Sequence, residues 1–573
     1  MTKSFKTTNQ RIVGVCVAFL VLFGVLWARC LYLQLFQSRQ LSRLAEAQHR
    51  IAHTLIAPRG NILDRDGRLL ATTVRAPSVF ANPRQVEAKA YLAHAIAPIV
   101  DRHERLLKRR LEQDKGFVWL ARHADRDVVD QLVRFQREGI GIVEEPKRIY
   151  PNGPLAAHLL GFTNIDQQGL EGLELAYDGV LRGRRGWEST LRDARGRLLV
   201  GPWTRRIDPQ PGSDVVLTLD SVVQGVVEEM LSWGVKEFRA KGGTIVVMDP
   251  HTGAILAIAN QPAFDPNHPA RVPAEARRNR AVTDLFEPGS VFKIVTAAAL
   301  LEEGLVRPEE RFFCENGEYR TIGRRILHDH TPHGWLTFRE VIVKSSNIGT
   351  VKAAQRLTPQ VFSQYIRGFG FGQKTGIELP GEVRGIVTPP ERWSKLSPFN
   401  IPMGQEVAAT PIQLAVMTSI VANGGWKVTP YLIQRIQTSS GEVLRDYQPS
   451  QRERLLRQET VDQLHDMLTS VVESGTGRLA NIQGLTAAGK TGTAQKLEPT
   501  GRYSHSLFVA SFVGYGPVPD PRFVMVVSID EPRPLYFGGV VAAPIFKRTV
   551  EQLAGYWELY GGENRGHKHI AQL

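Results

Sequence analysis

The sequence predicts a mixed α/β (α+β) protein with a single membrane-spanning helix near its N-terminus. Three observations support this fold class. An uncharged apolar run comes first, a region of short strands and polar helices follows, and helices and strands alternate more regularly from about residue 221. The chain has 573 residues, 42% of them hydrophobic and 22% charged, which suits roughly two to four ordinary globular domains.

The first element is an apolar run over residues 12–28 that has no charged residue and is bounded by Arg11 and Arg29. Its length is at the short end of the range for a spanning helix. Apolar residues resume after Arg29, whose long side chain can reach the membrane surface while the helix continues. We therefore expect a transmembrane anchor over residues 12–36.

The charges around this anchor predict its orientation. Lys3, Lys6 and Arg11 lie in the tail over residues 1–11 and favour a cytoplasmic N-terminus. A cleaved signal peptide is the alternative interpretation, but no small-x-small cleavage site follows Ala28. The protein is thus expected in the cytoplasmic (inner) membrane as a single-pass protein, with the rest of the chain on the outer, periplasmic side.

Residues 37–220 are expected to form a first extracytoplasmic domain of mixed structure. Residues 37–55 resemble a charged helix that leaves the membrane. An Asp-Gly pair at 66–67, between two apolar runs, predicts a hairpin. Residues 85–140 look mostly helical and polar, and the Pro- and Gly-containing stretch 209–212 resembles a linker.

A second, larger domain is expected over residues 221–560. A helix over 222–238 leads into a strand over 244–248, and a turn then connects to a second strand over 254–259. The tail over 561–573 is polar and is expected to be loose.

The strongest chemical motif is Ser290-Val291-Phe292-Lys293, which follows a Pro-Gly pair and opens an apolar, alanine-rich run. This context marks the start of a helix, where residues three apart share a face. A serine needs a base to become a nucleophile, and a buried lysine loses its proton readily enough to serve. Ser290 and Lys293 are therefore candidate nucleophile and base. The alternative, a solvated surface pair, is disfavoured by the apolar neighbours.

A second motif, Ser345-Ser346-Asn347, follows a helical stretch. The hydroxyl of Ser345 can relay a proton, and the amide of Asn347 can hold both a lysine and a substrate amide. A turn or helix cap is the ordinary interpretation of such a pattern when it stands alone.

A third motif, Lys490-Thr491-Gly492-Thr493, resembles an edge strand. Gly492 would let a substrate backbone approach and add as a further strand. The ammonium of Lys490 and the hydroxyls of Thr491 and Thr493 would hold a terminal carboxylate. Lys-Thr-Gly also occurs at 374–376, but that copy follows a glycine-rich stretch that predicts a loop, and we reject it.

Several other classes of function are excluded or disfavoured. The net charge of +14 suggests an anionic partner or a solvated basic surface, but no nucleic-acid-binding signature is present, and nucleic acid is excluded. His328, His330 and His333 crowd one segment, yet no further ligand clearly completes a metal site, so we expect no metal and no cofactor. Three cysteines allow no disulfide framework.

With the three motifs in this order, the chain resembles the class B, monofunctional penicillin-binding proteins, and within them the division-specific transpeptidases. The likeness covers nearly the whole chain. Further stretches resemble that family's motifs in its pedestal and its transpeptidase domain: Arg59-Gly60 to Ala71, Arg148 to Pro151, Gly161, Gly169 to Glu174, Asn279 to Ala281, Glu287 to Gly289, Thr375 to Glu382, Asp530 to Pro532, and Gly538-Gly539.

The resemblance implies a fold for each domain. Residues 37–220 would form an elongated, non-catalytic pedestal of the dimerisation type. Residues 221–560 would form a penicillin-binding, β-lactamase-like transpeptidase domain, in which an antiparallel sheet is packed between helices.

The resemblance also implies a reaction. Ser290 would attack the D-Ala-D-Ala bond of a peptidoglycan stem peptide, and an amine of a neighbouring stem would take the acyl group. Lys293 would be the base, Ser345 would pass a proton to the leaving amine, and Asn347 would orient Lys293. Backbone N–H groups of Ser290 and Thr493 would form the oxyanion hole. β-Lactams would acylate Ser290.

Other outcomes stay open from the sequence. A D,D-carboxypeptidase would use water as the acceptor, and a non-catalytic division scaffold or β-lactam sensor would need no base. The implied partners are stem peptides, lipid-linked precursor strands of the wall, a membrane-embedded glycan polymerase and other division proteins.

Overall fold

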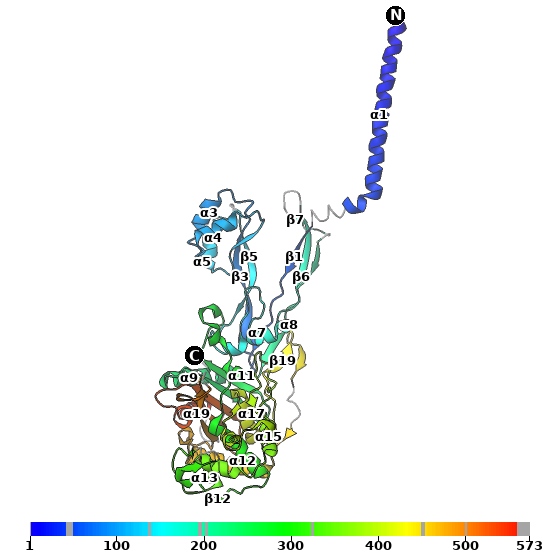
Figure 1. Ribbon diagram of the computed structural model, residues 1–573. Helices are drawn as coiled ribbons and strands as arrows, with labels where there is room; N and C mark the ends of the chain where they lie inside the picture. Colours follow the sequence, from blue (N-terminus) through cyan, green and yellow to red (C-terminus); the bar gives the residue numbers. More distant parts are fainter. Residues whose placement is uncertain are drawn as a thin grey trace. The chain divides into compact units, whose positions relative to one another are not determined.

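The computed structural model describes residues 2–41, 50–135, 139–192, 198–199, 201, 204–321, 326–447, 453–498 and 501–558. By its internal contacts the chain divides into two compact units, whose helices and strands are labelled in Figure 1. The first unit combines Met1–Pro58 with Gly183–Pro211, and the second combines Arg59–Arg182 with Gly212–Leu573.

The first unit contains the apolar helix and a small sheet. Helix α1 runs over Thr2–Phe36, and its part from Arg11 to Phe36 is long and apolar enough to cross a membrane, with a mean hydropathy of 2.4. This confirms the expected N-terminal helix by length and composition. The sheet consists of β1 (Arg50–Leu55), β6 (Gly186–Arg192), β7 (Leu198–Leu199) and β8 (Arg205–Ile207).

The helix predicted over 37–55 is wrong for its last six residues. Residues 50–55 form β1, which pairs antiparallel with β6, more than 130 residues later in the sequence, with Arg50 opposite Leu191. Local charge and propensity favour a helix here, but pairing with a distant strand decides the structure. Residues 42–49 lie outside the described part of the chain.

The second unit contains a mixed sheet in the order β20-β19-β9-β2-β3-β4, with β5 also paired to β3. The predicted Asp-Gly hairpin is confirmed as the turn between β2 and β3, where Gly67 has a φ of +85°. The strands are β2 (Ile62–Leu63), β3 (Leu69–Ala81), β4 (Val118–Ala121), β5 (Ile140–Ile149), β9 (Asp214–Leu217), β19 (Ile433–Gln437) and β20 (Val443–Asp446).

Among its described residues, the predicted helical region 85–140 contains three helices and the strand β4, and β5 begins at its last residue. The helices are α3 (Lys89–Ile96), α4 (Glu104–Leu111) and α5 (Arg126–Val133). Short helices follow at α6 (Ala157–Leu160), α7 (Gly172–Ala176) and α8 (Asp178–Leu181).

The candidate site is positioned by a five-stranded sheet in the order β11-β10-β24-β23-β22, in which every neighbouring pair is antiparallel. Both of its faces are buried, which confirms the predicted sheet between helices. Helices α9 (Ser221–Glu237) and α19 (Gly538–Leu553) cover one face, and α17 (Pro411–Ala422) and α18 (Gln458–Glu473) pack against the other, while α12 (Lys293–Glu302) packs against α18. The strands are β10 (Gly242–Met248), β11 (Ile255–Gln261), β22 (Ala488–Leu497), β23 (Tyr503–Gly516) and β24 (Phe523–Asp530).

Smaller elements complete the second unit. Those nearest the site are β14 (Ile326–His328), β15 (Trp335–Thr337), α13 (Phe338–Val343) and α14 (Asn347–Ala354). The others include α10 (Ala274–Arg277), α11 (Arg280–Thr283), β12 (Arg311–Phe313), β13 (Glu318–Arg320), α15 (Pro359–Gly368), β16 (Ile386–Val387), α16 (Ser397–Asn400), β17 (Val407–Ala408), β18 (Trp426–Lys427) and β21 (Glu453–Arg454). The domain boundaries at residues 37, 221 and 561 remain predictions, and the tail 561–573 lies outside the described residues.

Candidate active site

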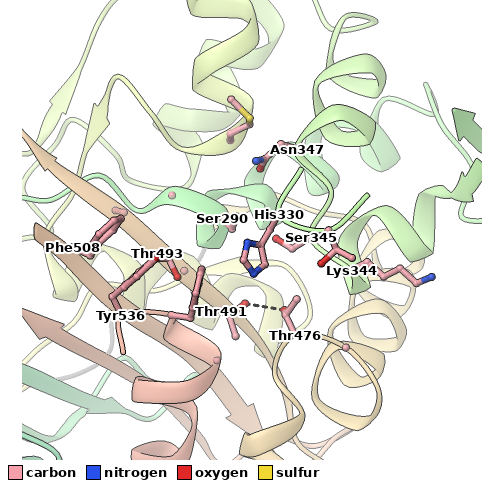
Figure 2. Close-up of a pocket in the computed structure, with 18 of the residues that line it drawn as sticks. Ser290, His330, Lys344, Ser345, Asn347, Thr476, Thr491, Thr493, Phe508 and Tyr536 are labelled. Carbon is pink, nitrogen blue, oxygen red and sulfur yellow. Dashed lines mark hydrogen bonds between the residues drawn. The ribbon is translucent and has the colours of Figure 1, made fainter. Parts of the chain in front are cut away.

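The three sequence motifs meet in one cleft of about 880 Å³ beside the edge strand β22. Figure 2 shows Ser290, Ser345, Thr491 and Thr493 around the same opening. They come from a turn before α12, from the loop between α13 and α14, and from β22. Residues 55 to 203 positions apart in the chain are therefore brought together.

Ser290 lies in a single 3₁₀ turn, Gly289–Phe292, that runs directly into α12. The turn begins at Gly289, whose φ of +53° is a left-handed value that a glycine adopts without strain. Residues three apart lie above one another in a 3₁₀ turn, so Ser290 and Lys293 share one side. Among the described residues, however, no direct hydrogen bond joins these two side chains.

Lys293 is the first residue of α12 and is completely buried. Its Nζ donates to the backbone oxygen of Ser345 at 2.6 Å and to Asn347 Oδ1 at 2.8 Å, with a longer contact of 3.3 Å to Ser345 Oγ. Burial lowers the pKa of Lys293 to about 7, although the negative charge of Asp329 opposes that shift. A lysine with this pKa can exchange a proton near neutral pH.

Ser345 connects the two lysines of the site. Its backbone has a φ of +57°, a strained value for a residue with a side chain. Its Oγ accepts from Lys490 Nζ at 2.9 Å and lies 3.3 Å from Lys293 Nζ. The hydroxyl therefore lies between the two lysine nitrogens, as a proton relay would require.

Asn347 begins helix α14, which Ser346 caps by accepting from the backbone N–H of Gly349 at 2.9 Å. The amide of Asn347 is fixed at both ends. Its Oδ1 accepts from Lys293, and its Nδ2 donates to the backbone oxygen of His328 at 2.9 Å. This arrangement fits the expected role of orienting Lys293.

Lys490 is also completely buried, and its Nζ lies behind the wall of the cleft. It donates to Ser345 Oγ and, at 3.2 Å, to the backbone oxygen of Thr491. Burial and the neighbouring Lys293 hold the pKa of Lys490 well below its usual value. A substrate carboxylate nearby would favour the ammonium form, so carboxylate binding would be coupled to proton uptake at this lysine.

The wall of the cleft itself presents the hydroxyls of β22. Thr491 Oγ1 lies 2.8 Å from Thr476 Oγ1, the contact drawn in Figure 2. Thr493 Oγ1 accepts from the backbone N–H of Gly538 at 3.0 Å, which leaves its own proton available to a ligand.

Gly492 lies between these two threonines and has a packing requirement that sequence analysis missed. A Cβ at this position would lie 2.4 Å from Ser511 Oγ and 2.8 Å from Val291 Cγ2. The glycine is thus needed for β22 to pass close to the Ser290 turn. Whether it also admits a substrate backbone remains a prediction.

The second Lys-Thr-Gly copy is structurally different, which supports its rejection. Residues 374–376 belong to a loop, and both the backbone N–H and the hydroxyl of Thr375 bind Glu382 Oε1 at 2.6 Å. None of these three residues lines the cleft.

The site includes a carboxylate behind the cleft lining that the motifs did not indicate. Asp329 accepts three hydrogen bonds from residues 346–348. Sequence analysis considered its histidine neighbours only as metal ligands. Among the described residues, no group of three or more His, Cys, Asp and Glu side chains is arranged to hold a metal ion. No local pattern marks Asp329, because it lies 17 residues before Ser346, the first of the residues that it binds.

Aromatic rings form another wall of the cleft. Phe508 stacks on Tyr536 with centroids 4.1 Å apart, and Phe537 lies beside Tyr536 and against the ring of His330 at 4.6 Å. Sequence analysis named His330 but assigned these aromatic residues no role.

Two family models match the chain. The penicillin binding protein transpeptidase domain matches residues 243–551, and the penicillin-binding protein dimerisation domain matches residues 54–217.

Relatives match over almost the whole chain. Stage V sporulation protein D of Bacillus subtilis is 34% identical and covers 95% of this chain and 85% of its own. The probable peptidoglycan D,D-transpeptidase PenA of Neisseria meningitidis is 35% identical, and the match covers 95% of this chain and 92% of its own. The peptidoglycan D,D-transpeptidase FtsI of Escherichia coli is 32% identical, and the match covers 94% of this chain and 90% of its own.

Solved structures agree. Penicillin-binding protein 3 of Mycobacterium tuberculosis, solved in complex with aztreonam, has a TM-score of 0.70 and 30% identity, and covers 89% of this chain and 98% of its own. The chain belongs to the penicillin-binding protein family, and its dimerisation domain ahead of a transpeptidase domain places it in class B.

Proposed function

We propose that this protein is a peptidoglycan D,D-transpeptidase that works through an acyl-enzyme on Ser290. The observation that carries the proposal is the hydrogen-bonded series from Asn347 through Lys293 and Ser345 to Lys490 beside that serine. The names of FtsI and PenA support the same activity.

The contacts of Lys293 explain how it acts as the base. A neutral amine has two N–H donors and one lone pair. The two shortest contacts, to the backbone oxygen of Ser345 and to Asn347 Oδ1, use both donors. The lone pair is then free to take the proton of Ser290 as its Oγ attacks the carbonyl carbon of the penultimate D-alanine.

The leaving D-alanine needs a proton on its nitrogen when the peptide bond breaks. Ser345 Oγ gives its proton to that nitrogen and is replenished from the lysines on either side. Backbone N–H groups of Ser290 and Thr493 stabilise the oxyanion, each contributing about 3 kcal/mol. Thr491 and Thr493 hold the terminal carboxylate from the wall of the cleft, and Lys490 behind that wall supplies positive charge to it. No cofactor is required.

In the second half of the reaction, an amine of a neighbouring stem peptide attacks the acyl carbonyl. Its proton passes to the same base, the bond to Ser290 Oγ breaks, and the serine regains its proton. β-Lactams enter the same path because their strained amide takes the place of the D-Ala-D-Ala bond.

The first test is labelling with a fluorescent penicillin. Wild-type protein should be labelled, and Ser290→Ala should not. Ser474→Ala is the matched control because Ser474 is an exposed serine that lines the same cleft, and it should be labelled normally. Absence of label on the wild-type protein would contradict the proposal.

A second measurement separates cross-linking from hydrolysis. Purified protein is supplied with a pentapeptide donor, with and without an added amine acceptor. A transpeptidase forms the amide product and releases D-alanine, whereas a carboxypeptidase releases D-alanine and leaves only tetrapeptide.

We also propose that the protein is a single-pass inner-membrane protein of septal wall synthesis, with its N-terminus in the cytoplasm. The basic residues ahead of the apolar run, Lys3, Lys6 and Arg11, support that orientation. Its partners would be a membrane-embedded glycan polymerase, lipid-linked precursor strands and other division proteins. Depletion should give filamentous cells, and rounded cells would instead indicate a role in elongation.

A further inference from the structure

Asp329 lies outside all three motifs, in the segment between β14 and β15, yet it is bound to the second motif at three points. Its carboxylate accepts from Ser346 Oγ at 2.6 Å, from the backbone N–H of Asn347 at 2.5 Å and from that of Ile348 at 3.0 Å. All three donors belong to the start of helix α14.

These contacts fix the position of the asparagine that orients the base. Asp329 holds the backbone of Asn347, and the adjacent His328 accepts from its Nδ2 through a backbone oxygen. With both attachments made, Asn347 Oδ1 is directed at Lys293 Nζ, 2.8 Å away. The segment 328–329 therefore sets the geometry of the contact between Asn347 Oδ1 and Lys293 Nζ, although neither of its residues bonds to Ser290 or Lys293.

Asp329 also acts on the charge of the base. Lys293 is faced by three titratable groups: Lys490 from β22, the Asp329 carboxylate, and the thiol of Cys314, which lies 3.4 Å from Ser346 Oγ. Lys490 shares Ser345 with Lys293 and disfavours a second positive charge. Asp329 is the negative charge that opposes this effect and the burial that lowers the pKa of Lys293.

We propose that Asp329 is a positioning residue that both aligns Lys293 through Asn347 and sets the pH range in which Lys293 acts as the base. This proposal rests on the proposed acylation of Ser290. It predicts that removing the negative charge and removing a hydrogen bond have different effects, because only the charge changes the protonation of Lys293.

Two substitutions separate charge from position. Asp329→Asn keeps an oxygen that can accept from the two backbone N–H groups but removes the charge. Ser346→Ala removes the hydroxyl contact and keeps the charge. Rates of acylation by a fluorescent penicillin are measured from pH 5 to pH 9 for wild-type protein and both variants, together with melting temperatures.

In the wild-type protein the rate should fall below about pH 7, where Lys293 becomes protonated. In Asp329→Asn this acid limb should move to lower pH by roughly half a unit to one unit. At pH 8 its rate should drop by about tenfold, because a neutral amide oxygen accepts from the two backbone N–H groups more weakly than a carboxylate does and Asn347 is held less firmly. In Ser346→Ala the rate should also fall, but the acid limb should stay at its wild-type position.

The proposal is overturned if the acid limb of Asp329→Asn coincides with that of the wild-type protein or moves to higher pH. If Asp329→Asn melts far below the wild-type protein, the same profile is measured on Asp329→Ser, and the same outcomes decide. Failure of the wild-type protein to be acylated would instead contradict the proposed function, so the two failures are distinguishable.

Discussion

Lys293 owes its chemistry to its surroundings more than to its place in a four-residue motif. The residue has no exposed surface, and both of its shortest contacts come from residues more than 50 positions away. An amine in such a place can give up its proton near neutral pH, whereas a guanidinium cannot.

Replacing Lys293 by arginine should therefore abolish its role as base while keeping the positive charge. We expect the acylation rate of Lys293→Arg with a fluorescent penicillin to fall by about 10² to 10⁴-fold, the usual contribution of a general base. Stopped-flow or gel-based labelling at pH 8 measures the rate, and the melting temperature checks the fold.

The matched control is Lys344→Arg, which changes an exposed lysine at the rim of the same cleft. It should be labelled at the wild-type rate. If Lys293→Arg is folded and labelled as fast as this control, Lys293 is not the base.

The identity of the site residues could be predicted from the sequence, but their contacts could not. The spacing of Ser290 and Lys293 correctly predicts that they share one side of a turn. It does not predict that Lys293 bonds to Ser345 and Asn347 instead of to Ser290, because those contacts depend on how distant segments pack. Asp329 was missed for the same reason.

Strand β22 shows how one element joins the nucleophile to the binding wall. The strand forms the edge of the five-stranded sheet, as its sequence predicted, and its next neighbour in space is the turn that carries Ser290. At Gly492 the approach leaves no room for a side chain, since a Cβ would lie 3.0 Å from the backbone oxygen of Pro288.

Gly492→Ala should push β22 away from the turn that carries Ser290. Both the nucleophile and the neighbouring threonine hydroxyls of β22 would then be misplaced. We expect acylation to slow by at least about tenfold, since small displacements at a reacting centre have large effects on rate. The fold should lose about 1–3 kcal/mol of stability, the usual effect of an added methyl group in a packed site. Labelling rates and urea unfolding measure the two effects.

Gly334→Ala is the control, because a Cβ there meets nothing closer than 3.7 Å and the residue lies next to the cleft residue His333. It should leave rate and stability close to wild type. Unchanged acylation in Gly492→Ala would show that the strand tolerates the methyl group and that the close packing is not required.

Helices and strands were predicted correctly where a local sequence pattern determines them, and incorrectly where pairing with a distant segment does. The strands predicted over 244–248 and 254–259 and the helix predicted over 222–238 are confirmed as β10, β11 and α9, because alternation and helical periodicity are read within a few residues. Strand β1 was missed because its partner β6 lies more than 130 residues away and nothing in residues 50–55 reveals it.

At the scale of the whole molecule, three stretches that were noted for their family resemblance meet in one buried cluster. They are the stretches that begin at Arg59, at Arg148 and at Gly169. Glu174 is fully buried and accepts from Arg59 Nε at 2.6 Å and from Arg148 Nε at 2.7 Å, while the hydroxyl of Tyr150 lies 3.3 Å away. Buried charges require such partners. The sequence contained these residues but gave no indication that they meet.

The mixed sheet that contains β2, β3 and β9 shows why domain boundaries drawn along the sequence do not describe the fold fully. Strands β19 and β20, which come from residues 433–446, extend the sheet that contains β2, β3 and β9. The chain thus returns to an early sheet after the site has been formed. No local pattern predicts such a long-range pairing.

Glu228 connects helix α9 to the earlier segment around Ala156, and it makes the stability of the folded chain depend on pH. It lies on α9, and its Oε1 accepts from the backbone N–H of Ala156 and from Gln224 Nε2, both at 2.7 Å. Burial raises the pKa of this carboxyl from 4.5 to about 7. The folded chain therefore keeps a proton between those pH values that the unfolded chain has lost, and stability should fall as the pH rises through that window.

Glu228→Gln removes the titration while keeping an oxygen that accepts from Ala156. At pH 8.5 the variant should be more stable than wild type by up to about 3 kcal/mol, the free energy that corresponds to the pKa shift, whereas at pH 4.5 the two should unfold alike. Urea unfolding of the full chain in detergent at both pH values measures this. Glu229→Gln, which changes the exposed carboxyl next to it, should show no such difference. A Glu228→Gln variant that loses stability equally at both pH values would show that the ionised carboxylate is needed for this contact.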